Sequence, residues 1–193
     1  EIELIQSRAM IAKTIRRLDF DISYFLTNNI RKAELYKRTP IKFTYDAISY
    51  YTYEHQIGVE ILDDKKYSIT YTDTKHGVEV SKEYLFGDLV SNALGKFTID
   101  KTENFKDINF NNAEYEKRNF IIIIHNFDRL VDRYTNGLNI QFVSKKSTVL
   151  QLSMKDPVAQ KAGDFLNKLL EVYIQSGIDQ KNENASNSLD FID

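Results

Sequence analysis

The sequence has no cysteine and no tryptophan, and only two prolines and seven glycines among its 193 residues. Without cysteine the chain can form no disulfide and no thiolate metal site, and it has no cysteine nucleophile. This composition suits the reducing cytosol and equally the oxidising bacterial periplasm. The glycines form no GxGxxG pattern, and Gly95-Lys96 lacks the upstream glycine of a phosphate-binding loop. GxSxG and HExxH are absent too, so the common nucleotide-binding and hydrolase motifs are excluded.

Neither sign of charge dominates, because 26 lysines and arginines face 28 aspartates and glutamates, for a net charge of −2. A nucleic-acid-binding domain needs a strong basic excess, so we predict no nucleic-acid partner. The longest apolar run, at 120–124, has the length of a strand and falls far short of the roughly 20 residues that span a bilayer. The chain shows no signal peptide and does not begin with Met. If the parent protein is secreted or membrane-bound, we expect its targeting segments to lie outside this sequence.

Apolar periodicity predicts a helix at the start of the chain and strands through its middle. The helix is expected at 1–18, since Leu4, Ile11, Ile15 and Leu18 recur at spacings of seven, four and three. Strands are expected at 21–26, 41–45, 58–62, 67–72 and 95–100, with turns at 28–29, 63–66 and Gly77. Residues 83–90 are ambiguous, and the polar segment 106–117 suggests a loop or weak strands.

The second half of the chain predicts a buried strand, a short helix and a hairpin. The β-branched run at 120–124 is typical of a central strand buried on both faces. A helix at 127–134 should close at Asn136-Gly137. The following segments, 138–143 and 148–154, alternate as a hairpin with one buried face. That face is formed by Leu138, Ile140, Phe142, Leu150, Leu152 and Met154.

A long helix is predicted to end the chain. Asp156 suits the N-cap and Pro157 the first helical position. Its apolar stripe comprises Val158, Ala162, Phe165, Leu166, Leu169, Leu170, Tyr173 and Ile174. The stripe thins after Ile178, and neither a Gly cap nor a Pro follows. We therefore expect residues 179–193 to be exposed as the start of a projecting coiled-coil helix. We also expect the chain to be a segment of a longer protein.

The predicted fold class is α+β, with a mixed β-sheet, helices packed on one face and a long C-terminal helix. Residues 1–178 are expected to form the α+β domain, and residues 179–193 the base of the projecting helix. The sequence shows no internal repeat and no other domain boundary.

Acid–base and metal-binding candidates are few. His55, His76 and His125 are far apart and none of their spacings suits a metal, so each is expected in a surface or turn position, His125 as a cap for the following helix. Asp63 and Asp64 sit in a turn, where adjacent side chains point apart and cannot converge on a substrate. We predict no catalytic residue, no metal site and no cofactor.

Four tyrosines lie within nine positions, at Tyr45, Tyr50, Tyr51 and Tyr53. The favoured interpretation is strand tyrosines that cover a half-exposed sheet, which also fits Tyr67 and Tyr71. The functional alternative is a stacking platform for sugars or bases, or a phosphorylation cluster. Tyr50, Tyr51 and Tyr53 are accordingly the candidate glycan contacts.

The first forty residues are biased toward arginine, at Arg8, Arg16, Arg17, Arg31 and Arg38. A solvated helix face is the default interpretation of such a bias. Contact with membrane phosphates or an acidic glycan is the alternative.

Two stretches resemble a known family, the periplasmic domains of Wzz/Wzc-type polysaccharide co-polymerases. The opening EIELIQSRAMIAKTIRRLDFDISYF is similar to the family's "SR" helix and short "dvsYf" strand, and RKAELYKRTPIKF continues the likeness. The closing stretch from Val149 is similar to the family's strand, "DP" helix start, "LN…Y" helix core and "K…A…SLxFI" continuation. Together the two cover less than half of the chain, in the family's order, in a style closest to the autokinases of Bacteroides-like bacteria.

The resemblance implies a domain in the periplasm between two inner-membrane helices. It implies a ring-forming homo-oligomer that works with a Wzy-type polymerase and an outer-membrane export channel to set polysaccharide chain length. In the tyrosine autokinase branch of capsule and exopolysaccharide synthesis, the kinase motifs and tyrosine-rich tail belong to a cytoplasmic domain. The sequence contains neither, and the tyrosines at 45–53 do not match that tail.

Three hypotheses follow. The leading one is a non-enzymatic periplasmic assembly domain, whose parent is expected to be a tyrosine-protein kinase. The second is a periplasmic carbohydrate-binding module that uses exposed tyrosines, and the two are compatible. The third, a stand-alone hydrolase or transferase, needs converging acid and base residues that the sequence does not reveal.

Overall fold

The computed structural model describes the chain except residues 1, 28–31, 74–75, 109–117, 145–146 and 191–193. Helices make up 35% and strands 39% of it, which confirms the α+β class. The chain forms two compact units. Asp21–Asn126 form one, which we call the β unit, while Glu1–Phe20 and Phe127–Asp193 together form the other, which we call the helical unit.

The β unit is built from a six-stranded sheet in the order β2-β1-β9-β4-β5-β6 and a three-stranded sheet in the order β3-β8-β7. Its elements are β1 (Ile22–Thr27), β2 (Lys32–Glu34), β3 (Ile41–Ile48), the 3₁₀ helix η1 (Tyr50–Thr52), β4 (Gln56–Ile61), β5 (Lys66–Asp73), β6 (Val78–Leu85), β7 (Val90–Asn92), β8 (Gly95–Lys101), η2 (Glu103–Asp107) and β9 (Asn119–Ile124). The helical unit contains α1 (Ile2–Ile5), α2 (Arg8–Ile15), α3 (Phe127–Gly137), β10 (Leu138–Phe142), β11 (Leu150–Met154) and α4 (Ala159–Asp190).

All the strand pairs in the described ranges are antiparallel, where we expected a mixed sheet. Short turns join β4 to β5 and β5 to β6, and such connections produce antiparallel neighbours. The helices of the helical unit pack on one another and on the β10–β11 hairpin, rather than on one face of a large mixed sheet.

One buried cluster contains side chains from both sheets of the β unit, so the two sheets pack face to face. Phe43 of β3 stacks on Phe97 of β8 at 4.7 Å between ring centroids. In β9, Phe120, Ile122 and Ile124 are buried, whereas the side chains between them are half-buried. The predicted central position of this strand is confirmed, but only one of its faces is fully buried.

The expected N-terminal helix is two helices, α1 and α2, because Ser7 starts a new one. The Ser7 hydroxyl accepts a hydrogen bond from the Met10 N–H at 3.2 Å, as an N-cap does. The interruption changes which side chains are buried. Ile11 and Ile15 are buried as predicted, whereas Leu4 is 52% exposed.

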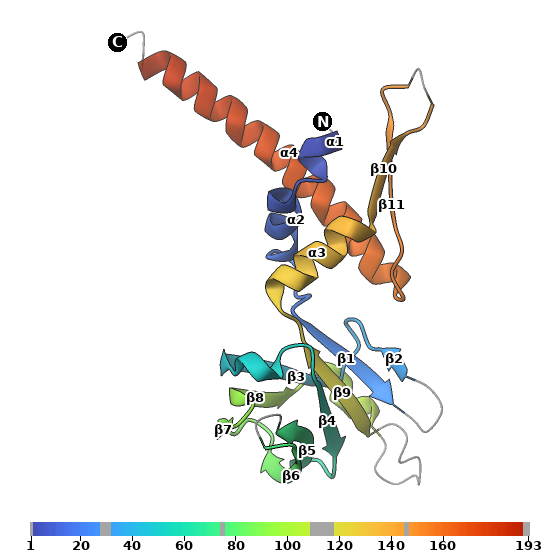
Figure 1. The fold of residues 1–193 in the computed structure, drawn as a ribbon, viewed down its shortest axis with the longest axis vertical. Helices are drawn as coiled ribbons and strands as arrows, with labels where there is room; N and C mark the ends of the chain where they lie inside the picture. Colours follow the sequence, from blue (N-terminus) through green and yellow to red (C-terminus); the bar gives the residue numbers. More distant parts are fainter. Residues whose placement is uncertain (1, 28–31, 74–75, 109–117, 145–146, 191–193) are drawn as a thin grey trace. The chain divides into compact units, whose positions relative to one another are not determined.

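The predicted hairpin of β10 and β11 is present, with Leu138 opposite Met154 and Phe142 opposite Leu150. On the predicted buried face, Leu138 and Ile140 are buried, and Leu150, Leu152 and Met154 are half-buried. Phe142, at the end of β10 (Figure 1), is 54% exposed, so the predicted face is not buried there. The preceding helix, α3, closes at Gly137, as Asn136-Gly137 predicted.

Helix α4 begins at Ala159, two residues later than predicted. The Asp156 carboxylate accepts from the Val158 N–H at 2.7 Å and thereby caps the turn that leads into the helix. The buried face of α4 has the helical spacing of three, four and three and comprises Ala162, Phe165, Leu169 and Val172. Phe165 packs on Tyr134 of α3 at 4.5 Å between ring centroids. Burying a side chain of this size stabilises the fold by roughly 1.5–3 kcal/mol.

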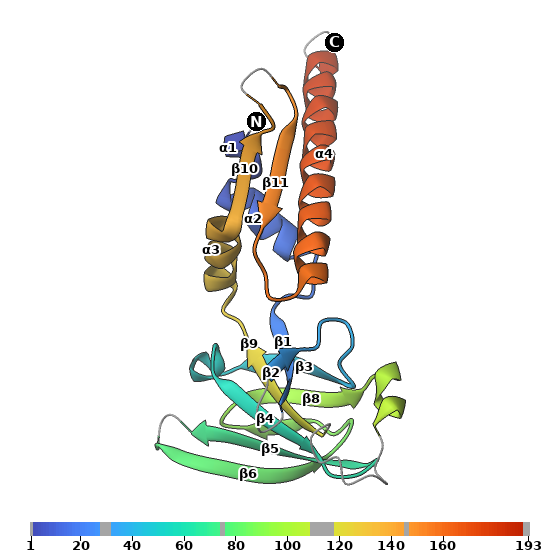
Figure 2. The ribbon, with the colours of Figure 1, turned by 90° about the vertical axis from the view of Figure 1, so that its right-hand side faces the viewer.

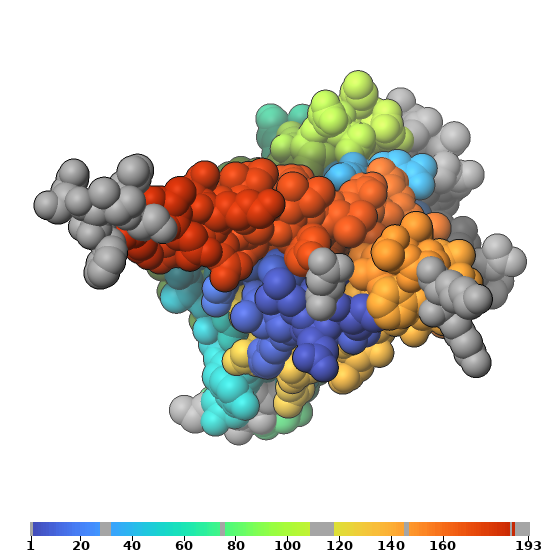
Figure 3. Space-filling model, turned by 90° about the horizontal axis from the view of Figure 1, so that it is seen from above, coloured from blue at the N-terminus to red at the C-terminus, as the bar shows by residue number. Residues whose placement is uncertain are grey.

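Beyond Val172, α4 leaves the core of its unit. All described side chains from 177 to 185 are exposed, so the predicted exposure of the polar part is confirmed for those positions. The 32 residues of α4 span about 48 Å, and its far end reaches past the N-terminal helices (Figures 2 and 3). No helix in the described part of the chain is long and apolar enough to cross a membrane.

Of the glycines in the described part of the β unit, Gly95 leaves the least space for a Cβ. Its substitution therefore tests the pairing of β3 with β8. Its φ is +137°, and a Cβ there would lie 2.2 Å from the Ala47 carbonyl oxygen of the paired strand. We expect Gly95→Ala to lower the free energy of unfolding by about 3 kcal/mol or more in urea, followed by far-UV circular dichroism. Gly87 also has a positive φ, +83°, but its nearest atom is 3.7 Å away. Gly87→Ala should therefore cost only about 1 kcal/mol, and equal losses would contradict this account.

Candidate functional site

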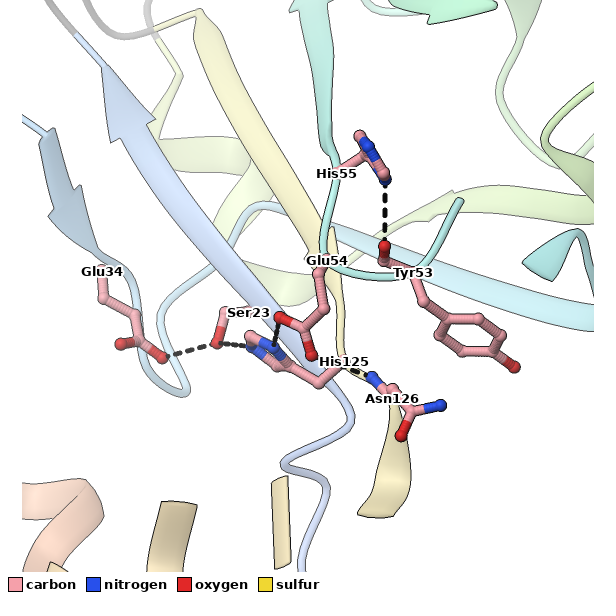
Figure 4. A network of polar contacts seen from close by, with 7 residues as sticks. All are labelled: Ser23, Glu34, Tyr53, Glu54, His55, His125 and Asn126. Carbon is pink, nitrogen blue, oxygen red and sulfur yellow. Dashed lines mark hydrogen bonds and ion pairs between the residues drawn. The ribbon is translucent and has the colours of Figure 1, made fainter. Parts of the chain in front are cut away.

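Four polar side chains of the β unit form a hydrogen-bonded chain at one end of the six-stranded sheet (Figure 4). Ser23 alternates along β1 with Tyr24, which packs on the core, so the Ser23 side chain points to the opposite face. His125 directly follows β9, Glu34 ends β2, and Glu54 lies between η1 and β4. We call these four residues the His125 network.

The His125 imidazole is the centre of the network. Its Nε2 lies 3.0 Å from Ser23 Oγ, and its Nδ1 lies 3.1 Å from Glu54 Oε2. Ser23 Oγ donates to Glu34 Oε1 at 3.0 Å, and the second Glu54 oxygen accepts from the Asn126 N–H at 3.0 Å. His125 is 7% exposed and Ser23 is 3% exposed, so the middle of the network is buried.

Glu54 adopts a left-handed backbone conformation, with a φ of +64° that disfavours a residue with a Cβ. Its N–H donates to the Ile124 carbonyl at 2.8 Å, and its carboxylate holds both His125 and the Asn126 N–H. These contacts offset the strained turn and tie it to the end of β9. The network therefore joins three segments that are distant in the sequence.

The distances resemble those of a Ser–His–carboxylate triad, but the serine hydroxyl donates its hydrogen bond in a different direction. A nucleophilic serine gives its proton to the imidazole. Ser23 instead donates to Glu34, because an ionised carboxylate can only accept, and its oxygen then serves as an acceptor toward His125. The buried hydroxyl is also out of reach of a substrate carbonyl. The network has the properties of a structural link.

His125 is not the helix cap that we expected from the sequence. Both of its ring nitrogens face Ser23 and Glu54, and its backbone N–H donates to the Asp21 carbonyl at 2.7 Å. The N–H of Asn126, just before α3, donates to the Glu54 carboxylate from the turn between η1 and β4.

The four clustered tyrosines have three different environments. Tyr50 is 76% and Tyr51 65% exposed on η1, with their rings edge to face at 5.9 Å. Tyr53 is half-buried. Tyr45 of β3 donates to Asp21 at 3.2 Å, and burial together with that carboxylate raises the pKa of Tyr45 to about 12. Only Tyr50 and Tyr51 of this cluster thus present an open aromatic surface.

Tyr51 lies at a surface hollow of about 400 Å³. The hollow is lined by Ser49, Tyr51, Thr52, Tyr71, Thr72, Asp73, His76, Ala93 and Leu94. Tyr71 is 8% exposed, so it belongs to the core as well as to the wall of the hollow, and burial raises its pKa. Tyr51 lies near the end of β5 because β4, which follows the tyrosine segment, pairs with β5 across the predicted turn at 63–66.

The remaining acidic and histidine candidates are accounted for locally. Asp63 accepts from the N–H groups of Lys65 and Lys66 at 2.6 and 2.7 Å, which lowers the pKa of Asp63 and confirms the predicted turn. His55 and His76 are exposed. No group of three His, Cys, Asp or Glu side chains in the described ranges is placed to hold a metal ion.

Three of the five N-terminal arginines have partners within the helical unit. Arg8 bonds Asp128 at 3.0 Å and lies 3.3 Å from Asp132, while Arg16 lies over the Phe127 ring at 4.9 Å. Arg17 approaches Glu171 at 4.0 Å. Arg38 is exposed, and Arg31 lies outside the described residues. These contacts favour the interpretation as a solvated helix face over a site for phosphates.

No protein-family model matches this chain. Comparison with curated proteins also finds no match.

His125→Ala should destabilise the β unit, because the imidazole bridges Ser23 and Glu54 in a buried position. We expect a loss of about 3 kcal/mol in the free energy of unfolding, measured in urea by tyrosine fluorescence. His55→Ala is the matched control, since His55 is exposed and its Nδ1 lies 3.0 Å from the carbonyl oxygen of its near neighbour Tyr53 (Figure 4). The control should change stability by less than about 0.5 kcal/mol. A similar small effect for His125→Ala would contradict the structural role.

Because the Ser23 hydroxyl donates to Glu34 rather than to His125, we predict that Ser23 is not a nucleophile. The rate of p-nitrophenyl acetate hydrolysis by the unaltered chain should equal that of the Ser23→Ala variant, once both are checked for folding by circular dichroism. A rate that falls more than about tenfold in Ser23→Ala would show an activated serine and reverse this interpretation.

Proposed function

We propose that this chain is a non-enzymatic assembly domain of an inner-membrane polysaccharide co-polymerase and works in the periplasm. In this role it contributes to setting the chain length and supporting the export of a capsular polysaccharide or exopolysaccharide. Its parent is proposed to be a tyrosine-protein kinase with a separate cytoplasmic kinase domain. Further copies of the chain, a Wzy-type polymerase and an outer-membrane export channel are the proposed partners.

The observation that carries the proposal is the meeting of the two ends of the chain in one unit. The first 20 residues of the opening stretch and the whole closing stretch from Val149 belong to the helical unit. Within it, α2 packs on α4, and Arg17 of the opening stretch approaches Glu171 of the closing stretch. Residues 1–20 of the opening stretch and the closing stretch from Val149 thus belong to one folded body, whereas the rest of the opening stretch belongs to the β unit. A shared ancestral domain would require at least the two helical parts to pack together.

An exposed apolar ridge on α4 supports an assembly role. Leu170, Ile174 and Ile178 are 39%, 60% and 47% exposed, and their spacing of four places them on one side of the helix. The buried face of α4 uses Phe165, Leu169 and Val172 instead. A second apolar line beside the first is typical of a helix that packs on another protein surface as well as on its own unit.

The hydrogen bonding of Ser23 in the His125 network is in keeping with a non-enzymatic role. In the His125 network the serine proton is committed to Glu34, and the hydroxyl is buried. The open aromatic surface of Tyr50 and Tyr51 is better suited to binding than to catalysis.

Loss of the gene that encodes this chain should change the length distribution of a surface polysaccharide in the source bacterium. We expect an in-frame deletion to remove the long polymers on a carbohydrate-stained gel, and the unaltered gene to restore them. Leu170→Glu with Ile174→Glu should fail to restore them, because two charges on the ridge oppose packing of apolar surfaces.

The matched control adds the same two charges to the other side of α4. Gln180 and Asn187 are exposed and lie away from the ridge, so Gln180→Glu with Asn187→Glu should restore long polymers fully. Immunoblotting checks that all variants accumulate equally. An unchanged length distribution in the deletion strain would overturn the proposed function. Full restoration of long polymers by the ridge variant would show that the exposed ridge of α4 is not required for it.

A further inference from the structure

Three contacts follow one another through the His125 network (Figure 4). Ser23 Oγ lies 3.0 Å from Glu34 Oε1 and 3.0 Å from His125 Nε2. On the other side of the ring, His125 Nδ1 lies 3.1 Å from Glu54 Oε2. Each of these distances is that of a hydrogen bond, so each contact needs one hydrogen between its two heavy atoms.

A neutral imidazole would leave this series one hydrogen short. The Ser23 hydroxyl carries one hydrogen and a neutral imidazole carries one, whereas an ionised carboxylate carries none. Two hydrogens cannot serve three contacts, so lone pairs would face each other at one contact in a buried site, which is costly. Additional contacts of the two carboxylates leave this count unchanged, because each of the three contacts needs a hydrogen of its own.

The imidazole is the group best suited to carry the third hydrogen. In water, histidine binds a proton more tightly than glutamate does, with ordinary pKa values of about 6.5 and about 4.3. In an imidazolium both ring nitrogens donate, Nδ1 to Glu54 and Nε2 to Ser23. The Ser23 hydroxyl is then free to donate to Glu34, and all three contacts are satisfied.

The surroundings of the ring act on its charge in opposite directions. Burial alone favours a neutral imidazole. The Glu54 carboxylate opposes this by direct contact, and the Glu34 carboxylate does so through Ser23. Asp21 presents its carbonyl to the His125 N–H, while its carboxylate accepts from Tyr45. Loss of the ring proton would remove an ion pair and also leave a buried contact without its hydrogen, so we expect the charged form to be favoured.

We propose that the β unit binds a proton at His125 when it folds, and that this proton makes the link between β1, β2, β9 and the Glu54 turn sensitive to pH. The folded chain then holds the proton more tightly than the unfolded chain, whose histidines titrate near 6.5. The stability that the site contributes is therefore fully present below about pH 6.5 and is lost as the pH rises through the higher pKa of the folded state.

The turn at Glu54 is the segment that deprotonation should loosen. Its left-handed backbone, with a φ of +64°, is held by the Glu54 N–H bond to Ile124 and by the carboxylate contacts with His125 and Asn126. The inference does not depend on the proposed assembly function, since the four residues of the network lie within the β unit.

Glu34→Gln provides the variant that separates this proposal from a simple loss of contacts. The Gln amide can donate to Ser23 Oγ, which allows the Ser23 hydroxyl to donate to Nε2 of a neutral ring. This variant should therefore close the network without the additional proton. Glu83→Gln is the matched control, because it makes the same change at an exposed position of β6.

The direct test is a long-range ¹⁵N–¹H titration of the histidine rings in the full chain, with His125 assigned by transfer from its backbone. At pH 7.0 both His125 ring nitrogens should show the shifts of protonated nitrogens in the unaltered chain and in Glu83→Gln. In Glu34→Gln the titration midpoint of His125 should fall by at least about one pH unit. An unprotonated ring nitrogen at pH 7.0 in the unaltered chain, or an equal midpoint in Glu34→Gln, would overturn the proposal.

Urea unfolding at pH 6.5 and pH 8.0 measures the linked stability. For one proton, the unfolding constant rises by up to about tenfold for each pH unit over which only the folded chain holds the proton. Between these two pH values it should rise at least about fivefold more in the unaltered chain than in Glu34→Gln, and Glu83→Gln should follow the unaltered chain. Parallel pH dependence in the unaltered chain and Glu34→Gln would contradict the proposal, and the ring titration of the unaltered chain decides the matter if Glu34→Gln does not fold.

Discussion

The pairing of β9 with β1 and β4 is the contact on which the β unit depends. β9 is the sixth strand of its sheet in sequence order, yet it lies in the middle, with β1–β2 on one side and β4–β5–β6 on the other. Without it these would be two separate hairpin structures, each with an open edge and a partly uncovered apolar face. The run from Phe120 to Ile124 is suited to this place because Phe120, Ile122 and Ile124 fill the core beneath both groups. Closing the long loop between β1 and β9 costs chain entropy before the contacts of the pair form. We therefore infer that β9 joins the sheet late in folding.

The end of β9 also explains why a polar network is buried beside an apolar strand. His125 is the first residue beyond β9, where the ladder ends and backbone groups need new partners. Its N–H donates a hydrogen bond to the Asp21 carbonyl. Its ring links Ser23 of β1 to the strained turn at Glu54. A buried polar group is tolerated only when its hydrogen bonds are made, and here three segments supply them. The resemblance to a catalytic triad arises from this structural requirement, since serine, histidine and glutamate can satisfy one another in few geometries.

Local patterns in the sequence predicted local structure, but they did not predict contacts between residues that are distant in the sequence. Asp63 and the two lysines after it specify a turn within four residues, and the turn is present. The break at Ser7 was also a local signal, a hydroxyl three positions before Met10, but the apolar spacing across it favoured one continuous helix. Ser23 and His125 are separated by 102 positions, and they meet because β1 pairs with β9. No periodicity or motif encodes such a meeting, so the exposed tyrosines were predictable from the sequence and the His125 network was not.

The chain order makes the β unit an insertion between α2 and α3, and its two ends are held together. Ile22 pairs with Ile124 across β1 and β9, and the His125 N–H donates to the Asp21 carbonyl at 2.7 Å. An insertion whose ends are adjacent places little strain on the host unit, because the host loses no more chain entropy than a short loop would cost. The helical unit can therefore retain the packing of α2 on α3 and α4 although the β unit is inserted between α2 and α3.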